Sequence, residues 1–470
     1  MNIGILSEEK NNRYLITPET AKLIIQGGNN IFFTTNIERD YHNQLTLIKS
    51  SEFNLKEKEE IKKIILFIKK NLKESNTFSI NEYKNIENKI QLRIKKLCKE
   101  KIFKSYKEVK DVYVDFFKKV AGYDFLESGA FRLKSNNLII DKCNFLTCYT
   151  FSSDFIDLLD EQHTIICYSN ALRNKNKINK IAAKKATLIG IEYIENQNSK
   201  RIIQEVISKL SARVGFNMIM SILNRQGIIL GNIPFNKKSN ITILGYGTVG
   251  KEIANIFNKF ECNITIFDKN ALILGDNNSY SFFSIHNEKQ FKESIKKSDI
   301  IVSAVGDKYK QCSNIFNEDC IKSIEKETLL FDFSINQGGI IKNAKETKQR
   351  DDISELYSIN NLNNNLLYSG IGDILQFTNV SVSNYISNIL AAYLFIIFDN
   401  KAEDSEYFDD SFIVKKGVIN SNFEFIETNN QVIPDIQDPF DLMDSDISEG
   451  WKNMDDVNDL LEANSNYEDK

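Results

Sequence analysis

Three glycines near the middle of the chain stand at a spacing that suits the binding of a phosphate group. Residues 245–250 read Gly-Tyr-Gly-Thr-Val-Gly and follow the apolar residues 240–244, which predict a buried strand. In this pattern the first glycine permits a tight turn, the second lets a pyrophosphate approach the backbone, and the third allows the following helix to pack on the strand. That helix would turn unpaired N–H groups and the positive end of its dipole toward the phosphates. The residues that we predict to line this loop are Gly245, Gly247, Thr248, Val249 and Gly250.

An acidic residue follows where the ribose end of such a site would lie. The apolar residues 263–267 predict a second strand, and it ends in Asp268. An acid about twenty positions after the first glycine accepts hydrogen bonds from the adenine-side ribose and repels a 2′-phosphate. We therefore predict NAD as the cofactor in preference to NADP, although the neighbouring Lys269 would soften that preference.

Two further apolar stretches predict more strands of the same sheet. Residues 299–305 and 329–333 are apolar enough to be buried, and glycine-containing loops follow both. Ligands of parallel sheets bind at the carboxyl ends of the strands. We therefore add Ala304 and Val305 to the predicted cofactor-binding residues.

The elements that must position this site divide the chain into several predicted segments. A chain of 470 residues exceeds what one compact core normally holds. Helical spacing of apolar residues at 201–224 and 383–398 predicts two long helices that cross between domains. The predicted segments are a substrate domain at 1–225 with a helical insertion at about 40–120, a Rossmann NAD-binding domain at 226–364, a return segment at 365–400 and a tail at 401–470.

Composition excludes several classes of protein. A hydrophobic content of 42% and a net charge of -4 are typical of a folded globular chain and do not favour nucleic-acid binding. Lysines of the helical insertion alternate with glutamates, as on a solvated helix face. Beyond residue 400 acids greatly outnumber bases, so we predict an acidic, largely disordered tail that could bind a protein partner.

Cysteine spacing and the apolar runs favour a cytoplasmic protein. The seven cysteines include no C-x-x-C pair, so neither a disulfide framework nor a metal site is predicted. The first residues lack the pattern of a secretory signal, and the apolar run at 389–398 is shorter than the roughly twenty residues of a membrane span. We expect no membrane contact, and we expect self-association through the apolar faces of the two long helices.

In its order of segments the chain resembles the alanine dehydrogenase and transhydrogenase family, which includes saccharopine dehydrogenases. Four stretches carry the resemblance: residues 3–19 with an Arg-x-x-x-Thr-Pro turn, residues 211–234, the glycine-rich loop, and residues 332–339. The resemblance implies an α/β fold of two Rossmann-like domains with parallel sheets, of which the N-terminal domain is discontinuous. It also implies NAD-dependent oxidation or reduction of an amino-acid or imino-acid carbon.

The resemblance assigns polar roles to a few residues and leaves others unfilled. Arg13 falls on the family's substrate-carboxylate arginine, and a guanidinium is a bidentate partner for a carboxylate, although a solvated loop arginine is the alternative. Thr150 stands where the family has a histidine, and Asn336 replaces an aspartate. The family's lysine would lie near residues 120–135, where only Lys134 is available and outside the expected motif. Asp373 lies in a glycine-rich loop, either completing the nicotinamide pocket or serving as a turn residue.

Two functions follow from this mixture. The first is an NAD-dependent oxidoreductase with Arg13 on a substrate carboxylate and with Thr150, Asn336 and Asp373 as candidate catalytic groups. A neutral hydroxyl and a neutral amide cannot accept a proton near neutral pH, so we expect a substrate other than alanine. The alternative is a catalytically degenerate NAD-binding scaffold or partner subunit, which would bind the cofactor without turnover.

Overall fold

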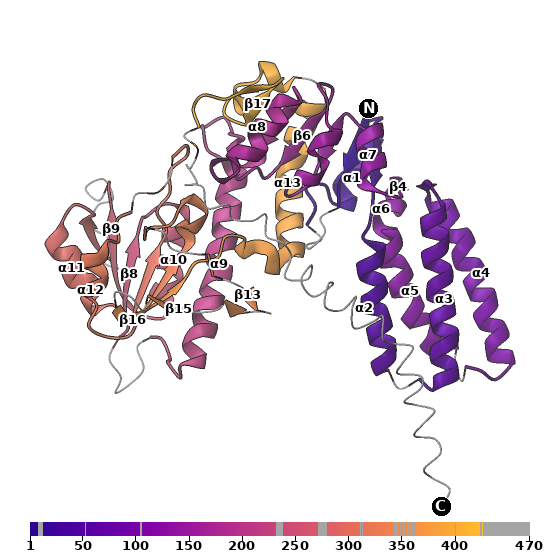
Figure 1. The fold of residues 1–470 in the computed structure, drawn as a ribbon, viewed down its shortest axis with the longest axis horizontal. Helices are drawn as coiled ribbons and strands as arrows, with labels where there is room; N and C mark the ends of the chain where they lie inside the picture. The colour runs from indigo at the N-terminus through magenta and orange to yellow at the C-terminus, as the bar shows by residue number, and fades with distance from the viewer. Residues whose placement is uncertain are drawn as a thin grey trace, which may run out of the picture. The chain divides into compact units, whose positions relative to one another are not determined.

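The computed structural model describes most of a compact unit that runs from Met1 to Phe425. The described residues are 1–7, 13–51, 53–103, 106–231, 238–270, 280–310, 312, 314–342, 346–347, 349–350, 353–354, 357–359, 363–399, 401–423 and 425. Their strands form two large sheets, and helices lie beside both (Figure 1).

The first sheet has nine strands among the described residues, in the order β18-β17-β7-β6-β5-β1-β2-β4-β3. The six inner strands from β7 to β4 pair in parallel, whereas β3, β17 and β18 add antiparallel edges. The strands are β1 (Asn2–Ile5), β2 (Asn30–Phe33), β3 (Thr77–Phe78), β4 (Phe131–Leu133), β5 (Phe145–Thr147), β6 (Thr164–Cys167), β7 (Thr187–Gly190), β17 (Phe412–Lys415) and β18 (Val418–Ile419).

The second sheet has seven strands among the described residues, in the order β10-β9-β8-β11-β12-β16-β15. All its neighbours pair in parallel except β15 and β16. The strands are β8 (Asn240–Leu244), β9 (Asn263–Asp268), β10 (Ser281–Ser284), β11 (Ile300–Ser303), β12 (Thr328–Asp332), β15 (Tyr357–Ile359) and β16 (Asn363–Ser369). A two-stranded sheet, β13 (Gln349–Arg350) and β14 (Ile353–Ser354), accompanies it. The predicted α/β class with parallel-rich sheets is confirmed.

Strand order in the second sheet creates a place for a ligand. The chain leaves β8 for β9 on one side and later returns to β11 on the other. Ligands of such sheets bind at this switch point, above the carboxyl ends of the strands. The accompanying helices are α10 (Thr248–Lys259), α11 (Glu288–Lys297), α12 (Glu318–Lys322) and the short 3-10 helix η5 (Phe333–Gln337).

Shorter helices connect the strands of the first sheet. They are α1 (Pro18–Gln26), α6 (Tyr123–Glu127), α7 (Asn136–Lys142), α8 (Lys175–Ala183) and the 3-10 helices η1 (Ser153–Leu158), η2 (Ala171–Arg173) and η3 (Ile191–Tyr193). Pro18 opens α1, at a position where a missing N–H costs no hydrogen bond.

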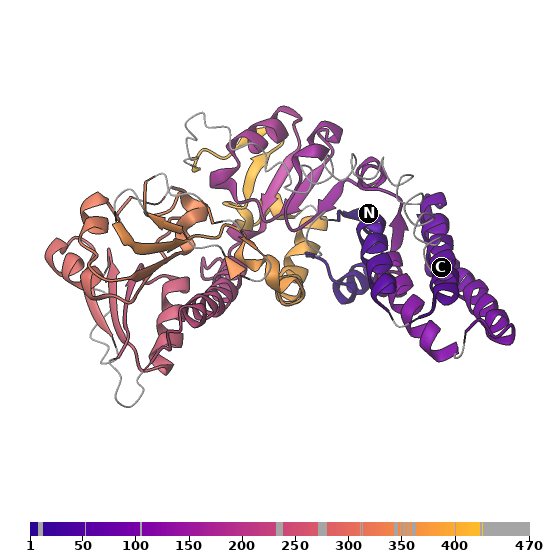
Figure 2. The same cartoon turned by 60° about the horizontal axis from the view of Figure 1, so that its bottom comes forward.

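Four longer helices pack side by side as a bundle between β2 and β4 (Figures 1 and 2). They are α2 (Ile37–Ser50), α3 (Leu55–Glu74), α4 (Ile80–Lys99) and α5 (Tyr106–Ala121). Asn54 caps α3 through a reciprocal pair of bonds with Glu57, and Ser79 caps α4 in the same way with Glu82. The buried face of α3 consists mainly of isoleucines at helical spacing, which gives the bundle its core.

Two long helices join the parts of the molecule. These are α9 (Ile202–Arg225) and α13 (Asn379–Phe398), which contact each other, while α9 also packs on α10 and α13 on α1. The 3-10 helix η6 (Ile374–Thr378) precedes α13. By length and composition alone α9 and α13 could each span a membrane, although a core helix meets the same test. The apolar run at 389–398 is therefore the last part of α13, which begins four residues before the predicted helix at 383–398 and has the length of a membrane span.

Two of the predicted boundaries need correction. The tail predicted from residue 401 is wrong for its first part, because η7 (Ala402–Asp404), η8 (Glu406–Phe408), β17 and β18 fold against the first sheet. Phe408, Ile413 and Val414 are buried there, and this apolar content was masked by the acidity of the segment as a whole. The return segment predicted from residue 365 begins later, because β16 belongs to the second sheet. The rest of the predicted tail, from residue 426, lies outside the described residues.

Candidate functional site

The glycine-rich loop between β8 and α10 has a conformation that requires two of its glycines. Gly245 has φ 94°, and a Cβ atom there would lie 2.6 Å from the Ala304 carbonyl oxygen. A Cβ at Gly250 would lie 2.0 Å from the Gly245 carbonyl oxygen, so only glycine lets the helix approach the turn. Gly247 is the N-cap of α10, and among the described residues no heavy atom lies within 4 Å of its Cβ position. The loop is therefore open at its second glycine, where the N-terminus of α10 begins.

Asp268 ties this loop to the end of β9. Its carboxylate accepts a hydrogen bond from the Tyr246 backbone N–H at 2.7 Å and another from the Asn270 N–H at 2.8 Å. A carboxylate has about four acceptor sites, so capacity remains for the hydroxyls of a ribose. The half-buried Asp268 thus both fixes the loop and offers a negative acceptor beside it.

Residues Ala304 and Val305 begin the loop that follows β11 and adjoin the glycine-rich loop. The Ala304 N–H donates to the Leu244 carbonyl at 2.7 Å. Gln337 of η5 fixes the next residues, because its side-chain oxygen accepts from the Asp307 N–H at 2.9 Å and its amide donates to the Asp307 carbonyl at 3.2 Å. The structure therefore brings the predicted cofactor-binding residues together at adjacent strand ends.

Arg13 is buried, which excludes its interpretation as a solvated loop residue. Its side chain is 2% exposed, and its Nη1 lies 2.8 Å from Oδ1 of Asp373, whose side chain is 46% exposed. The guanidinium carbon lies 3.9 Å from the centre of the Tyr149 ring, and that ring stacks on Tyr168 at 5.7 Å. A buried cation needs such partners. The structure thus joins two predicted site residues that are 360 positions apart.

Asn336 of η5 lies in a second polar cluster, which contacts the glycine-rich segment just before Asp373. Its Oδ1 accepts from Nη1 of Arg173 at 2.8 Å, and its Nδ2 donates to the Gly372 carbonyl. Glu346 accepts from the Gly372 N–H at 2.7 Å and lies 3.4 Å from Arg173. Because Gly372 precedes Asp373, the cluster adjoins the Arg13 ion pair. Sequence reasoning missed Arg173, although its position at the end of η2, just after β6, could have suggested it.

Two further residues from the sequence prediction, Thr150 and Lys134, have exposed side chains. Thr150 follows Tyr149 at the end of β5, and its side chain is exposed. Lys134 is also exposed, whereas the buried cation of β4 is Arg132, which donates to Thr35 Oγ1 at 3.0 Å and to the Leu72 carbonyl at 3.2 Å. Burial lowers the pKa of Arg132 to about 10.

Asp332 holds the turn that carries Asn336. This carboxylate is fully buried and accepts hydrogen bonds from the Ser334 N–H at 2.8 Å and the Tyr368 hydroxyl at 2.9 Å. Burial raises its pKa, while these hydrogen bonds act in the opposite direction. Since Asp332 is fully enclosed, we interpret it as a structural anchor of η5 and not as a ligand-binding group.

Comparison with known proteins agrees with this geometry. Residues 211–419 match the family described as "Alanine dehydrogenase/PNT, C-terminal domain". An alanine dehydrogenase of Staphylococcus saprophyticus is 26% identical over 191 residues, which are 38% of this chain and 51% of that protein. Alanine dehydrogenase 2 of Staphylococcus aureus is 28% identical over 154 residues, which are 32% of this chain and 41% of that protein. The chain therefore spans about half or less of the curated relatives that it matches.

Solved structures show the fold. An L-alanine dehydrogenase superimposes with a TM-score of 0.62 at 14% identity, covering 89% of this chain and 96% of that one. A transhydrogenase from Sinorhizobium meliloti superimposes with a TM-score of 0.57 at 11% identity, covering 89% and 100%. The molecule thus has the two-Rossmann-domain fold of these two solved structures. By sequence, residues 211–419 are distantly homologous to the alanine dehydrogenase/PNT family, whose members are NAD(P)-dependent dehydrogenases.

Proposed function

We propose that this protein is an NAD-dependent oxidoreductase that acts on an amino-acid or imino-acid carbon. The observation that carries the proposal is the loop between β8 and α10, whose second glycine is open toward the helix N-terminus. Because glycine has no side chain, the space beside Gly247 is open to a pyrophosphate, which a larger residue would exclude. Asp268 supplies an acceptor for the adenine-side ribose. When bound, the nicotinamide supplies or accepts the hydride, and the protein orients the substrate.

The substrate that we propose carries a carboxylate. Two arginines are linked to the Gly372–Asp373 segment. Arg13 pairs with Asp373, and Arg173 donates to Asn336, which in turn donates to the Gly372 carbonyl. The Arg13 charge is already balanced by Asp373, but Asp373 is half-exposed and can exchange its place with a substrate carboxylate. Thr150 and Asn336 are neutral, so Asp373 is the ionisable side chain among the three predicted catalytic residues. This combination favours a substrate other than alanine.

Titration with the two nicotinamide nucleotides tests the cofactor. We expect NADH to bind more tightly than NADPH in calorimetric titration, because the Asp268 carboxylate repels a 2′-phosphate. Asp268→Asn should narrow that difference by about tenfold or more, the equivalent of about 1.4 kcal/mol. Asp299→Asn is the matched control, because Asp299 lies at the amino ends of β8 and β11, opposite the ends that carry the loop. Tighter binding of NADPH by the wild type would contradict the assignment of Asp268.

A second function is favoured by the pairing of Arg13 with Asp373. If substrate cannot displace Asp373, the protein binds the dinucleotide without chemistry and serves as an NAD-binding scaffold or partner subunit. The two functions differ in turnover. A panel of 2-amino acids with NAD, and of 2-oxo acids with an amine and NADH, should change NADH absorbance for the oxidoreductase and leave it constant for the scaffold.

A further inference from the structure

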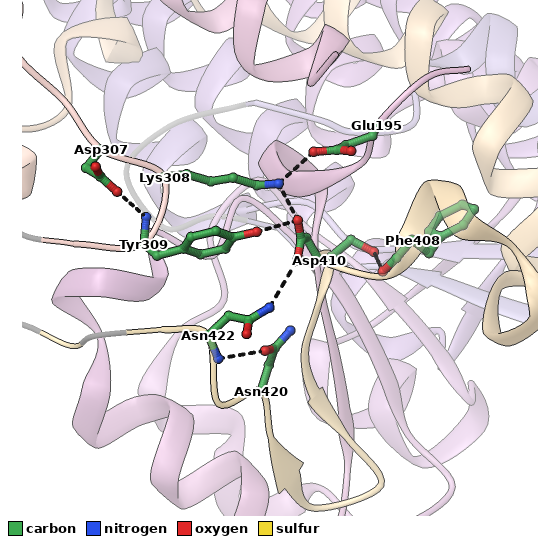
Figure 3. Close-up of polar contacts among 9 residues, drawn as sticks. Glu195, Asp307, Lys308, Tyr309, Phe408, Asp410, Asn420 and Asn422 are labelled. Carbon is green, nitrogen blue, oxygen red and sulfur yellow. Dashed lines mark hydrogen bonds and ion pairs between the residues drawn. The ribbon is translucent and has the colours of Figure 1, made fainter. Parts of the chain in front are cut away.

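A partly buried ion cluster links the loop after β11 to the segment after α13 (Figure 3). Lys308 Nζ lies 2.6 Å from Oε1 of Glu195 and also contacts Oδ2 of Asp410. The Tyr309 hydroxyl donates to the same carboxylate oxygen. The Lys308, Glu195 and Asp410 side chains are 23%, 21% and 19% exposed. The contacts are thus shielded from water better than those of an ordinary surface ion pair.

Both charged groups at the centre of the cluster keep their charges. Burial acts to lower the pKa of Lys308, but its hydrogen bonds to Asp410 and Glu195 outweigh burial and raise it. Burial acts to raise the pKa of Asp410, but hydrogen bonds from Lys308 and Tyr309 outweigh it and lower that pKa. Neither group is poised to exchange a proton near neutral pH. The cluster is a fixed ionic contact and not a proton-transfer site.

Aromatic contacts extend the same junction. The Phe423 ring lies 5.5 Å from the Tyr309 ring and 4.9 Å from the Tyr193 ring, both edge to face. The Glu195 N–H donates to the Tyr407 carbonyl at 3.0 Å. Residues 407–423, which we name the C-terminal clasp, therefore contact both the β11 loop and the end of η3. Figure 3 shows Asp410 of the clasp between Lys308 and Asn422.

The β11 loop is placed to receive one half of a dinucleotide. In the second sheet β8 lies between β9, which ends in Asp268, and β11, which leads into Ala304. With the adenine-side ribose at Asp268 and the pyrophosphate at Gly247, the nicotinamide half must extend over the end of β11. Gln337 fixes one side of this loop at Asp307, and the clasp fixes the other.

We propose that Asp410 is a positioning residue for the nicotinamide half of the cofactor. Through Lys308 and Tyr309 it holds the β11 loop in its receiving conformation, so that cofactor binding and docking of the clasp stabilise each other. Asp410 makes no contact with the cofactor itself. The inference rests on the proposed function, because it assumes that a dinucleotide binds at Gly247.

Asp410→Asn tests the inference with NADH and AMP as probes. AMP carries only the adenine half, which reaches the glycine-rich loop and Asp268 but not the β11 loop. We expect the Kd of NADH to rise about five- to hundredfold, the usual range of coupling between sites, while the Kd of AMP stays unchanged. Tyr309→Phe should cause a smaller loss of the same kind. Asp409→Asn, at an exposed neighbouring acid, should change neither Kd.

Two results would overturn the positioning role. One is wild-type affinity for NADH in Asp410→Asn, and the other is an equal loss of NADH and AMP, which would indicate general damage to the fold. Wild-type protein that binds neither nucleotide would instead refute the proposed function on which the inference rests. The outcomes are therefore distinguishable.

A second measurement needs no variant. Because coupling is reciprocal, saturating NADH should slow hydrogen–deuterium exchange across residues 407–423 of the wild type, whereas saturating AMP should not. Peptides from helix α4, which belongs to the helical bundle and packs on α5 and α6, serve as the internal reference. Unchanged exchange of the clasp in protein saturated with NADH would overturn the proposal.

Discussion

Replacing Asp373 by asparagine separates the two roles that Arg13 can have. In the structure Oδ1 of Asp373 lies 2.8 Å from Nη1 of Arg13. An incoming substrate carboxylate must therefore compete with Asp373 for the Arg13 guanidinium. Asp373→Asn keeps the side-chain shape and removes the competing charge. Because Asp373 is 46% exposed, water partly screens its ion pair with Arg13. We therefore expect Asp373→Asn to lower the free energy of unfolding by about 1 kcal/mol or less.

Ligand binding should respond in the opposite direction to stability. With NADH present, Asp373→Asn should bind pyruvate about fivefold more tightly, since about 1 kcal/mol of competition is removed. Arg13→Ala should weaken pyruvate binding by roughly 1.5 to 3 kcal/mol, the range for a hydrogen bond to a charged group. Pyruvamide has no carboxylate, so neither variant should alter its affinity.

Calorimetric titration and thermal unfolding of the same three proteins measure both effects. Two outcomes would refute the reasoning. If Asp373→Asn weakened pyruvate as Arg13→Ala does, Asp373 would contact the ligand and not compete with it. If neither substitution changed pyruvate binding, the buried Arg13 would have only the structural role of pairing with Asp373 and Tyr149.

Three further predictions follow from the same structure. The pKa of Asp410 lies below its ordinary 3.8 and that of Lys308 above its ordinary 10.5, so their contribution to stability is complete between these values. This contribution to stability is lost as pH falls through the lowered pKa of Asp410 or rises through the raised pKa of Lys308. The first prediction is therefore that the unfolding free energies of wild type and Asp410→Asn differ by a constant amount around neutral pH. A stability difference that changed between pH 6 and 8, as measured by urea unfolding, would contradict this. The second prediction concerns the substrate: we expect wild-type protein to reduce NAD with alanine weakly or not at all in a spectrophotometric assay. Val380 and Tyr385 are exposed apolar residues of α13, and Tyr385→Lys should shift a proposed homo-oligomer toward monomers in sedimentation velocity, while unchanged sedimentation would exclude this face.

The second sheet and its glycine-rich loop were predictable because their signals are local. The close packing at Gly250 and the acid at Asp268 depend on neighbours within one strand-helix-strand unit, whereas Gly245 also packs against Ala304 after β11. The order of the strands needed the resemblance to a family, since apolar runs alone do not specify neighbours. The bundle from α2 to α5 was predictable from isoleucine spacing at the level of helices.

Long-range pairs in the substrate region were not predictable from local pattern. Nothing near Arg13 in the sequence indicates that its partner is Asp373, and Arg173 has no motif of its own. The fold of residues 402–419 was missed because net acidity outweighed a short apolar strand that gains its stability from pairing with β7. Such strands depend on tertiary contacts, which composition does not record.

The most direct test of the account is calorimetric titration of NADH into wild-type protein and Gly247→Val. We predict saturable one-site binding to the wild type and no measurable binding to Gly247→Val, because a valine side chain would fill the open side of the loop where the pyrophosphate approaches the backbone. Circular dichroism should show the variant folded, since among the described residues its Cβ position is free of contacts. Equal binding of NADH by the two folded proteins would contradict the assignment of this loop as the dinucleotide site.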